Sequence, residues 1–168
     1  TAVIQSNYNG QDVTCNGASD GIAEAWGTDG TPPYTYVWSN SIQTSIVTGL
    51  SAGTYSCVVT DANNCTATSN NITLVDPPVL TSTSTTSDAS CNALNDGTAT
   101  VNPNGGTPGY TYTWSNSQLT QTATGLLAGT YTCTVTDANG CPSIVSATVS
   151  QPTPLSLSIS SISNVSCN

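Results

Sequence analysis

The chain has 168 residues, contains no Lys, Arg or His, and carries nine acidic residues that give it a net charge of −9. A surface without cations cannot neutralise phosphate groups, which excludes nucleic acids and anionic membranes as partners. Without His or Lys the usual catalytic bases are missing, and no apolar stretch is long enough to span a bilayer, so we expect a non-catalytic protein that does not insert into membranes.

The cysteines recur with a period of 76 residues: Cys15, Cys57 and Cys65 align with Cys91, Cys133 and Cys141, and Cys91 aligns with Cys167. A long fixed period indicates tandem modules. We therefore expect repeat 1 at residues 1–76, repeat 2 at residues 77–152, and the first strand of a third repeat at residues 153–168. Within each repeat we name the three cysteines the opener, the mid-strand and the closer cysteine, in chain order.

The predicted elements of each repeat are all strands. After the opener cysteine comes an Asp-Gly turn, then a short strand with small apolar residues facing inward. A Gly-Thr-Pro loop separates it from an aromatic strand, Tyr34–Trp38 in repeat 1 and Tyr110–Trp114 in repeat 2. We expect a weaker strand around residues 44–48, followed by a glycine-rich connection at residues 49–53.

The next strand shows the clearest pattern. Tyr131, Cys133 and Val135 alternate with four threonines. This alternation predicts an antiparallel strand with one face in the core and one in water. An Asp-Ala-Asn hairpin turn follows in both repeats. The closing strands do not share the period of 76, which predicts a bulge or a change of register there.

About seven short strands per repeat, with a Trp on the third and a Tyr-x-Cys on the sixth, are typical of an immunoglobulin-like fold. We therefore predict an all-β protein of tandem immunoglobulin-like antiparallel β-sandwiches. The aromatic residues that share the inward positions are expected in the two cores: Tyr36, Trp38, Tyr55, Tyr112, Trp114 and Tyr131.

Three motifs resemble the SprB-type repeat: Cys-Asn-x-x-x-Asp-Gly, Gly-Thr-Pro-x-Tyr-Thr-Tyr-x-Trp-Ser and Leu-x-Ala-Gly-Thr-Tyr-x-Cys-x-Val-Thr-Asp-Ala-Asn. Repeats of this family build long cell-surface adhesins of gliding Bacteroidota. The resemblance implies export by the type IX pathway, a place on the bacterial cell surface, and a role in adhesion or gliding motility. It implies no catalytic residues.

The cysteines leave several pairings open. Cys15, Cys65, Cys91, Cys141 and Cys167 lie beside turns and are disulfide candidates, whereas Cys57 and Cys133 are candidates for buried thiols. Within repeat 1 the opener could pair with the closer (Cys15–Cys65) or with the mid-strand cysteine (Cys15–Cys57). In a linear array the opener end of one repeat meets the closer end of the next, so Cys15–Cys141 is a third pairing, and it would stiffen the array.

Trp26 has no tryptophan counterpart in repeat 2 and is expected on the water-facing side of its strand. It either covers a loop or domain junction, or it offers a surface for a sugar ring or another chain.

Asp20, Asp61, Asp96 and Asp137 open turns, where an aspartate commonly binds its own backbone. They are also weak candidates for Ca²⁺ ligands, because loops at a domain junction can bring oxygen atoms together. We expect no other cofactor.

The sequence thus predicts a structural stalk or spacer segment of an extracellular adhesin or surface filament. Its expected partners are neighbouring repeats of the same chain, and identical chains or a surface polysaccharide. The alternative is a carbohydrate-binding module that uses Trp26.

Overall fold

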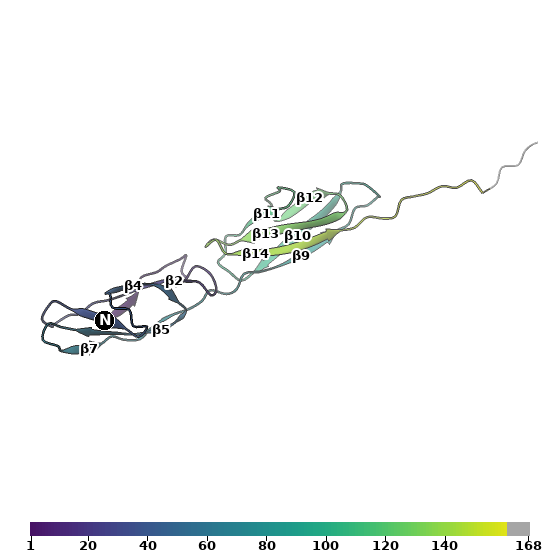
Figure 1. Cartoon of the computed structure of the whole chain (residues 1–168). Helices are drawn as coiled ribbons and strands as arrows, with labels where there is room; N and C mark the ends of the chain where they lie inside the picture. The colour runs from purple at the N-terminus through teal and green to yellow at the C-terminus, as the bar shows by residue number, and fades with distance from the viewer. Residues whose placement is uncertain (161–168) are drawn as a thin grey trace, which may run out of the picture.

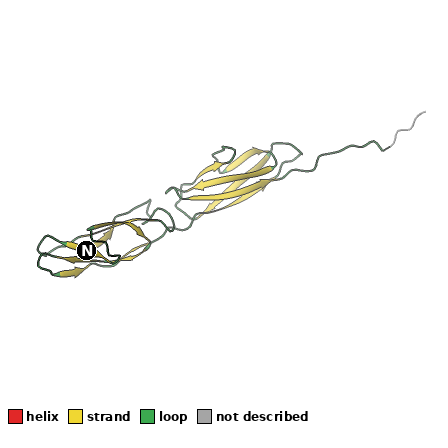
Figure 2. Ribbon diagram, in the orientation of Figure 1, coloured by secondary structure: helices red, strands yellow, loops and turns green. Residues whose placement is uncertain are grey.

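The computed structural model describes residues 1–160 and shows two β-sandwiches placed end to end (Figure 1). The described residues form strands and loops, as the sequence predicted, and no helix among them could cross a membrane (Figure 2). Residues 151–160 extend from the far end of the second sandwich without forming a strand. The remainder of the expected third-repeat strand, residues 161–168, lies outside the described residues.

Repeat 1 contains two three-stranded sheets, of strand order β1-β2-β4 and β3-β6-β7, and the pair β5-β8, all antiparallel. Short interruptions at Ser56 and at residues 69–71 separate β5 from β6 and β7 from β8, so the eight strands occupy six positions. The strands are β1 (Ala2–Ile4), β2 (Ser19–Ala25), β3 (Thr35–Trp38), β4 (Ile46–Ser51), β5 (Gly53–Tyr55), β6 (Cys57–Thr60), β7 (Thr66–Thr68) and β8 (Ile72–Leu74).

Repeat 2 has the same plan with six uninterrupted strands, in sheets of order β12-β10-β9 and β11-β13-β14. These strands are β9 (Thr81–Ser87), β10 (Gly97–Asn104), β11 (Thr111–Trp114), β12 (Thr122–Leu126), β13 (Gly129–Thr136) and β14 (Pro142–Val149). The order corresponds to the A-B-E and C-F-G sheets of an immunoglobulin-like sandwich. The strand called D in that fold is missing, so each repeat has six strand positions where the sequence pattern suggested about seven.

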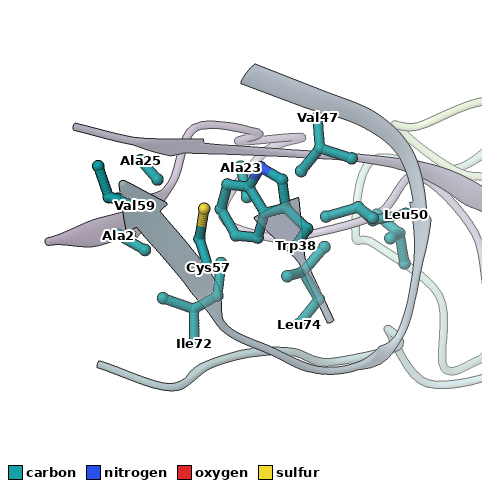
Figure 3. Packing of buried hydrophobic residues seen from close by; sticks show 11 residues of the cluster. Ala2, Ala23, Ala25, Trp38, Val47, Leu50, Cys57, Val59, Ile72 and Leu74 are labelled. Atoms are coloured by element: carbon teal, nitrogen blue, oxygen red, sulfur yellow. The ribbon is translucent and has the colours of Figure 1, made fainter. Parts of the chain in front are cut away.

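Each sandwich has its own hydrophobic core, and the two clusters share no residue. Trp38 and Trp114 are each 2 % exposed and pair with the mid-strand cysteines Cys57 and Cys133 on the neighbouring strand. Figure 3 shows Trp38 and Cys57 in the core of repeat 1. The indole nitrogens donate to main-chain oxygens, Trp38 to Thr44 at 2.8 Å and Trp114 to Thr120 at 2.9 Å. A buried indole therefore keeps its one polar group satisfied. The four tyrosines expected inward are half-buried and pack against these cores: Tyr36, Tyr55, Tyr112 and Tyr131.

The bounds of the strand that follows the aromatic strand differ from the sequence prediction. In repeat 1 it begins at Ile46 and continues through Gly49 to Ser51, a stretch predicted to be a connection. Gly49 has φ of +73°, which bends the strand and turns Leu50 into the core, where it is 2 % exposed. A glycine that looks like a loop residue is here a bulge inside a strand.

The closing strands bear out the predicted change of register. Gly53 pairs with Leu74, and its counterpart Gly129 pairs with Val149. Leu74 and Val149 are 75 positions apart, one fewer than the period of 76. From this point to the end of each repeat, equivalent residues are separated by 75 positions.

Candidate functional site

The loops at the facing ends of the two sandwiches form a joint, and several of the predicted site residues meet there. Repeat 1 contributes its opener loop (residues 13–18) and a preceding loop (residues 5–12), which we name the clasp loop. Repeat 2 contributes its closer hairpin (residues 137–141) and Thr107. The linker, residues 76–80, runs between them (Figure 1).

The opener loop is held against the linker by hydrogen bonds. The Asn16 side-chain amide donates to the oxygen of Pro77 at 3.0 Å, and the Gly17 amide donates to the carboxylate of Asp76 at 3.1 Å. Within the loop, the amide of Thr14 donates to Asp20 at 3.1 Å, and the Thr14 hydroxyl donates to the other oxygen of that carboxylate. Asp20 therefore fixes the backbone next to Cys15.

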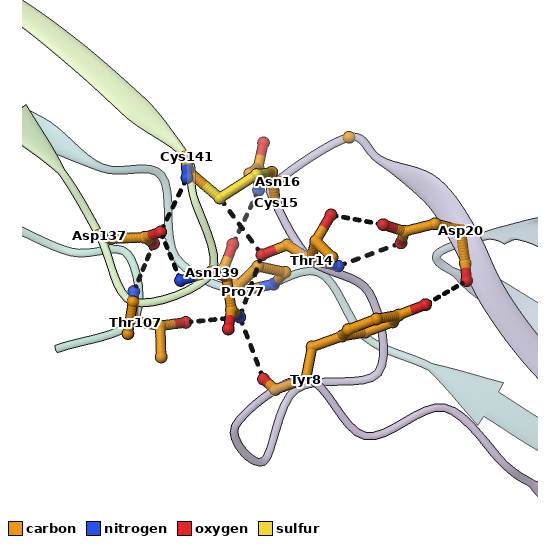
Figure 4. Close-up of a disulfide and its surroundings, with 12 residues drawn as sticks. Tyr8, Thr14, Cys15, Asn16, Asp20, Pro77, Thr107, Asp137, Asn139 and Cys141 are labelled. Carbon is orange, nitrogen blue, oxygen red and sulfur yellow. Dashed lines mark hydrogen bonds between the residues drawn. A yellow bond between two sulfur atoms is a disulfide. The ribbon is translucent and has the colours of Figure 1, made fainter. Parts of the chain in front are cut away.

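One carboxylate organises the closer hairpin of repeat 2. Asp137 accepts the amides of Asn139 at 2.9 Å, of Cys141 at 2.8 Å and of Thr107 at 2.8 Å. Asp137 and Thr107 are each only 5 % exposed. These bonds orient the side chains of Asn139 and Cys141 toward repeat 1 (Figure 4).

A disulfide joins the two repeats. Cys15 of the opener loop is bonded to Cys141 of the closer hairpin, with 5.7 Å between their Cα atoms and a sequence separation of 126 (Figure 4). Of the three pairings left open by the sequence, the structure contains the one across the joint. The pairings within repeat 1 are not formed, because Cys57 lies in the core and Cys65 lies in the hairpin at the opposite end of the sandwich.

Asn139 forms a second, non-covalent latch beside the disulfide. Its side-chain amide donates to the main-chain oxygens of Tyr8 at 3.0 Å and Thr14 at 3.3 Å, and its oxygen accepts from the side chain of Asn9 at 2.6 Å. Tyr8 is itself anchored to repeat 1, since its hydroxyl donates to the oxygen of Asp20 at 2.9 Å. The latch therefore binds the hairpin of repeat 2 to two separate loops of repeat 1.

The clasp loop is an insertion that the sequence analysis did not recognise. Ile4 and Thr86 are equivalent residues, because they pair with the equivalent residues Ala23 and Ala99. Ile4 lies 11 positions before Cys15, but Thr86 lies only 5 positions before Cys91. Repeat 1 thus has six additional residues between its first strand and its opener cysteine. An unequal spacing before the two opener cysteines is visible only once the strand register is known.

The acidic calcium candidates bind protein groups in the structure. Asp61 accepts the amides of Thr31 and Cys65, and Asp96 accepts both the amide and the hydroxyl of Ser90. The Thr31 amide, followed by that of Cys65, lowers the pKa of Asp61, and the hydroxyl of Ser90 lowers the pKa of Asp96. Across residues 1–160, no three acidic or cysteine side chains gather in a way that could hold a metal ion.

The remaining predicted site residues lie apart from the joint. Cys57 and Cys133 are completely buried thiols, and burial raises the pKa of each. Cys65 and Cys91 are exposed and not bonded, and Cys167 lies outside the described residues. Trp26 is 38 % exposed and lines a hollow of about 250 Å³ at the far end of repeat 1, together with Gly30, Tyr34 and Cys65.

The geometry defines a class of protein: tandem immunoglobulin-like sandwiches joined end to end by a covalent bond and a polar latch. The SprB repeat family model matches residues 7–42 and 83–119, once in each sandwich. Two regions of the chain therefore match the SprB repeat model, which confirms the resemblance drawn from the three motifs.

The comparison with curated proteins finds no match. Among solved structures, the three N-terminal domains of the Hoc outer capsid protein of bacteriophage RB49 match with a TM-score of 0.52 and 17 % identity, over 90 % of this chain and 59 % of that one. An amphioxus IgVJ-C2 molecule matches with a TM-score of 0.37 and 17 % identity, over 81 % of this chain and 98 % of that one. Fibronectin(III)-like modules of Clostridium thermocellum CbhA match with a TM-score of 0.35 and 10 % identity, over 90 % and 95 %.

At these identities the likeness to solved structures concerns the fold alone, and the chain spans 59 % of the Hoc structure. The two regions that match the SprB repeat model fit a structural repeat of extracellular proteins. The disulfide is consistent with an extracellular location, because such bonds persist in oxidising compartments.

Proposed function

We propose that this chain is a non-catalytic stalk segment of a cell-surface adhesin or extracellular filament, and that it resists extension. The observation that carries the proposal is the Cys15–Cys141 disulfide. Adhesion and gliding motility, which the SprB resemblance implies, both require a tether that transmits tension between the cell and a distant contact.

The disulfide changes the path that tension follows. A force applied to the two ends of the chain reaches Cys15, crosses the sulfur–sulfur bond, and continues from Cys141. The chain between the two cysteines, with a sequence separation of 126, then forms a closed loop that force on the ends cannot straighten. This loop contains β2 to β13, which is most of both sandwiches.

The latch and the acidic surface support the same function. Asn139 binds the clasp loop and the opener loop, so the joint resists bending as well as stretching. A net charge of −9 without any cation discourages like chains from sticking to each other along their sides.

Single-molecule stretching tests the proposal. In the native chain, unfolding should release only the segments outside the disulfide loop. In the double variant Cys15→Ser, Cys141→Ser, the 126 positions become extensible, which adds roughly 420–450 Å of contour length at about 3.3–3.6 Å per residue.

A reducing agent should make the force–extension curve of the native chain the same as that of the double variant. The variant Cys65→Ser, which removes an unbonded thiol, is the control and should behave as the native chain does. Full extension of the native chain under oxidising conditions would contradict the proposed function.

A second candidate function is carbohydrate binding at the hollow beside Trp26. The partly exposed indole of Trp26 and the ring of Tyr34 line the hollow, and aromatic faces stack on sugar rings. Binding to polysaccharides that disappears in Trp26→Ala would support this function, and equal binding by the two proteins would reject it.

A further inference from the structure

The far end of repeat 2 repeats the construction of the opener end of repeat 1. Three hydrogen bonds that position the opener loop at the joint have direct counterparts there. Asn92 donates to the oxygen of Pro152 at 3.3 Å, the Ala93 amide donates to the Gln151 side chain at 2.8 Å, and the Ser90 amide donates to Asp96 at 2.9 Å. Cys91 is therefore held as Cys15 is, but it is exposed and not bonded.

The far end of repeat 1 likewise repeats the closer hairpin of repeat 2. Asp61 accepts the amide of Thr31 at 3.1 Å, of Asn63 at 2.9 Å and of Cys65 at 2.8 Å, as Asp137 does in repeat 2. The Asn63 side chain donates to the Thr31 hydroxyl at 3.0 Å, as Asn139 does to Thr107 at 3.1 Å. Asn63 and Cys65 thus have the setting of Asn139 and Cys141, with no repeat packed against them.

The hollow beside Trp26 corresponds to the place that the linker occupies in repeat 2. There, the Gly106 amide donates to the oxygen of Pro78 at 2.9 Å, and a side chain at Gly106 would lie 3.1 Å from Cβ of Leu80, which is buried in the core. The counterpart of Gly106 is Gly30, which lines the hollow. Its amide donates to the hydroxyl of Tyr34 at 3.2 Å in place of a linker oxygen.

The segment that leaves repeat 2 has the chemistry to fill such a hollow. Counted from Pro77 and Pro152, which accept equivalent hydrogen bonds, Leu155 corresponds to Leu80. Leu155 is fully exposed, and Leu157 is 96 % exposed at the next position on the same face of an extended chain. Leu80, in contrast, is 9 % exposed in its own repeat.

We propose that the two free ends of this chain are the two halves of the same joint, and that each docks another SprB repeat. The closer hairpin and the hollow of repeat 1 receive the opener loop and following segment of another repeat, with Cys65 bonded to its opener cysteine. Cys91 bonds in the same way to the closer cysteine of another repeat. The inference rests on the proposed stalk function, which it extends from one joint to a continuous series.

The bond needs an oxidant. Joining two thiols releases two protons and two electrons, and a disulfide such as oxidised glutathione accepts the electrons and becomes two thiols. The joint at Cys91 lacks a clasp loop, because only 5 positions separate Thr86 from Cys91. It therefore depends on the disulfide, the opener loop and the exit segment.

Two complementary variants of the full chain test the proposal. Both carry Cys167→Ser, so that each keeps one of the two exposed cysteines, Cys65 or Cys91. The first, Cys65→Ser, keeps Cys91, and the second, Cys91→Ser, keeps Cys65. In a glutathione redox buffer each variant alone should stay monomeric, because neither has both cysteines that the disulfide of a joint requires. Their mixture should form a covalent dimer of twice 17.0 kDa.

Mass spectrometry after digestion with a protease other than trypsin should identify the Cys65–Cys91 linkage. Asn63→Ala in the second variant should lower the dimer yield about fivefold, which is the factor that one net hydrogen bond is worth. Leu155→Asp in the first variant should lower the yield too, and Ile144→Asp, at an apolar position on β14 that is 72 % exposed, should not.

Near-ultraviolet circular dichroism of each variant is the control for folding, and each spectrum should match that of the native chain. Equal dimer formation by each variant alone would show undirected thiol reactivity and overturn the proposal, as would a mixture that stays monomeric. These outcomes are independent of the stretching experiment, which depends on the Cys15–Cys141 bond within one chain.

Discussion

Single aspartates organise the loops at both ends of each sandwich. Asp61 and Asp137 each accept two backbone amides of a closer hairpin and one of the adjacent Gly-Thr-Pro loop. Asp20 and Asp96 each fix the residue before an opener cysteine. A carboxylate that accepts several amide hydrogen bonds is stabilised in its charged form. In a chain without cations, the backbone supplies the positive partners that Lys and Arg supply elsewhere.

The lowered pKa of Asp61 predicts a specific dependence of stability on pH. Because its pKa in the folded state lies below the ordinary value of 3.8, the carboxylate stabilises the fold above that value. This contribution is lost as the pH falls through the folded-state pKa. Asp61→Asn should therefore be less stable than the native chain at neutral pH and should lose less stability on acidification.

Urea unfolding at neutral pH and at about pH 3 measures the difference. Asp29→Asn is a suitable control, because Asp29 lies near the same hairpin and lines the same hollow without accepting a hydrogen bond from any described residue. An Asp61→Asn variant as sensitive to acid as the native chain would refute the prediction.

Two glycines show where residue identity depends on the fold. The sequence predicts turns at the Asp-Gly pairs, but Gly21 lies within β2 and Gly97 begins β10. A Cβ atom at Gly97 would lie 2.5 Å from Val149 and 2.9 Å from the oxygen of Leu126, and Gly21 has the same kind of neighbours. Glycine is needed there because strands of the two sheets approach closely, which no local pattern reveals.

At the scale of elements, the closer hairpins of the two repeats are alike in themselves and differ in what they contact. Asn139 and Asn63 make the same internal bonds, but only Asn139 reaches a neighbouring repeat. This pair allows the contribution of the latch to be separated from that of the hairpin.

Asn139→Ala should weaken the Cys15–Cys141 bond. The variant loses the bonds to Tyr8 and Asn9, so the effective concentration of the two thiols should fall about 5- to 30-fold, corresponding to one or two net hydrogen bonds. The measurement is the fraction of this disulfide in a glutathione redox series, quantified by mass spectrometry.

Asn63→Ala is the matched control and should leave that equilibrium unchanged, since Asn63 does not touch the joint. An equal effect of the two substitutions would mean that the hairpin fold, and not the latch, determines the strength of the disulfide.

Sequence periodicity predicted the inward faces of the strands well. Alternation along residues 130–136 placed Cys133 and Val135 in the core, where both are completely buried. It performed less well for β4, because Gly49 and Ser51 resemble a turn while Leu50 between them is buried. Alternation reports which side of a strand faces the core, but a bulge changes the alternation without ending the strand.

At the scale of the whole molecule, the disulfide couples two cores that would otherwise be independent. Each core is complete in itself, and the contacts between repeats are confined to loops at the joint. Closing a loop of 126 positions restricts the unfolded chain, which is worth about 2–4 kcal/mol for a typical disulfide.

The double variant Cys15→Ser, Cys141→Ser should accordingly lose about 2–4 kcal/mol of unfolding free energy. Its two repeats should also unfold in separate steps, since only the linker and the latch then connect them. Calorimetry and urea unfolding, followed by the signals of Trp38 and Trp114, measure both effects. An unchanged stability and a single shared transition would show that the repeats are coupled by other contacts.

If the same joint recurs, the disulfides limit extension along the whole series. The Cys15–Cys141 bond spans a sequence separation of 126. The first opener cysteine after Cys141 is Cys167, which lies 26 positions after Cys141 in the sequence. Only the segments of this length, between one closer cysteine and the opener cysteine that follows it, would remain free to straighten under tension. The repeats would then act as a stiff tether and not as a chain of springs.

The amino-acid pattern alone predicted the modular plan: the period of 76 and the alternating strands indicate tandem β-sandwiches with Trp38 and Trp114 in the cores. These properties are local or periodic, so they can be recognised without coordinates. Only the tertiary structure decided which cysteines pair, what the clasp loop does and why the ends of the chain match. Those properties depend on distances between loops that are far apart in sequence, and several pairings are compatible with one pattern of cysteines until the fold places the loops in space.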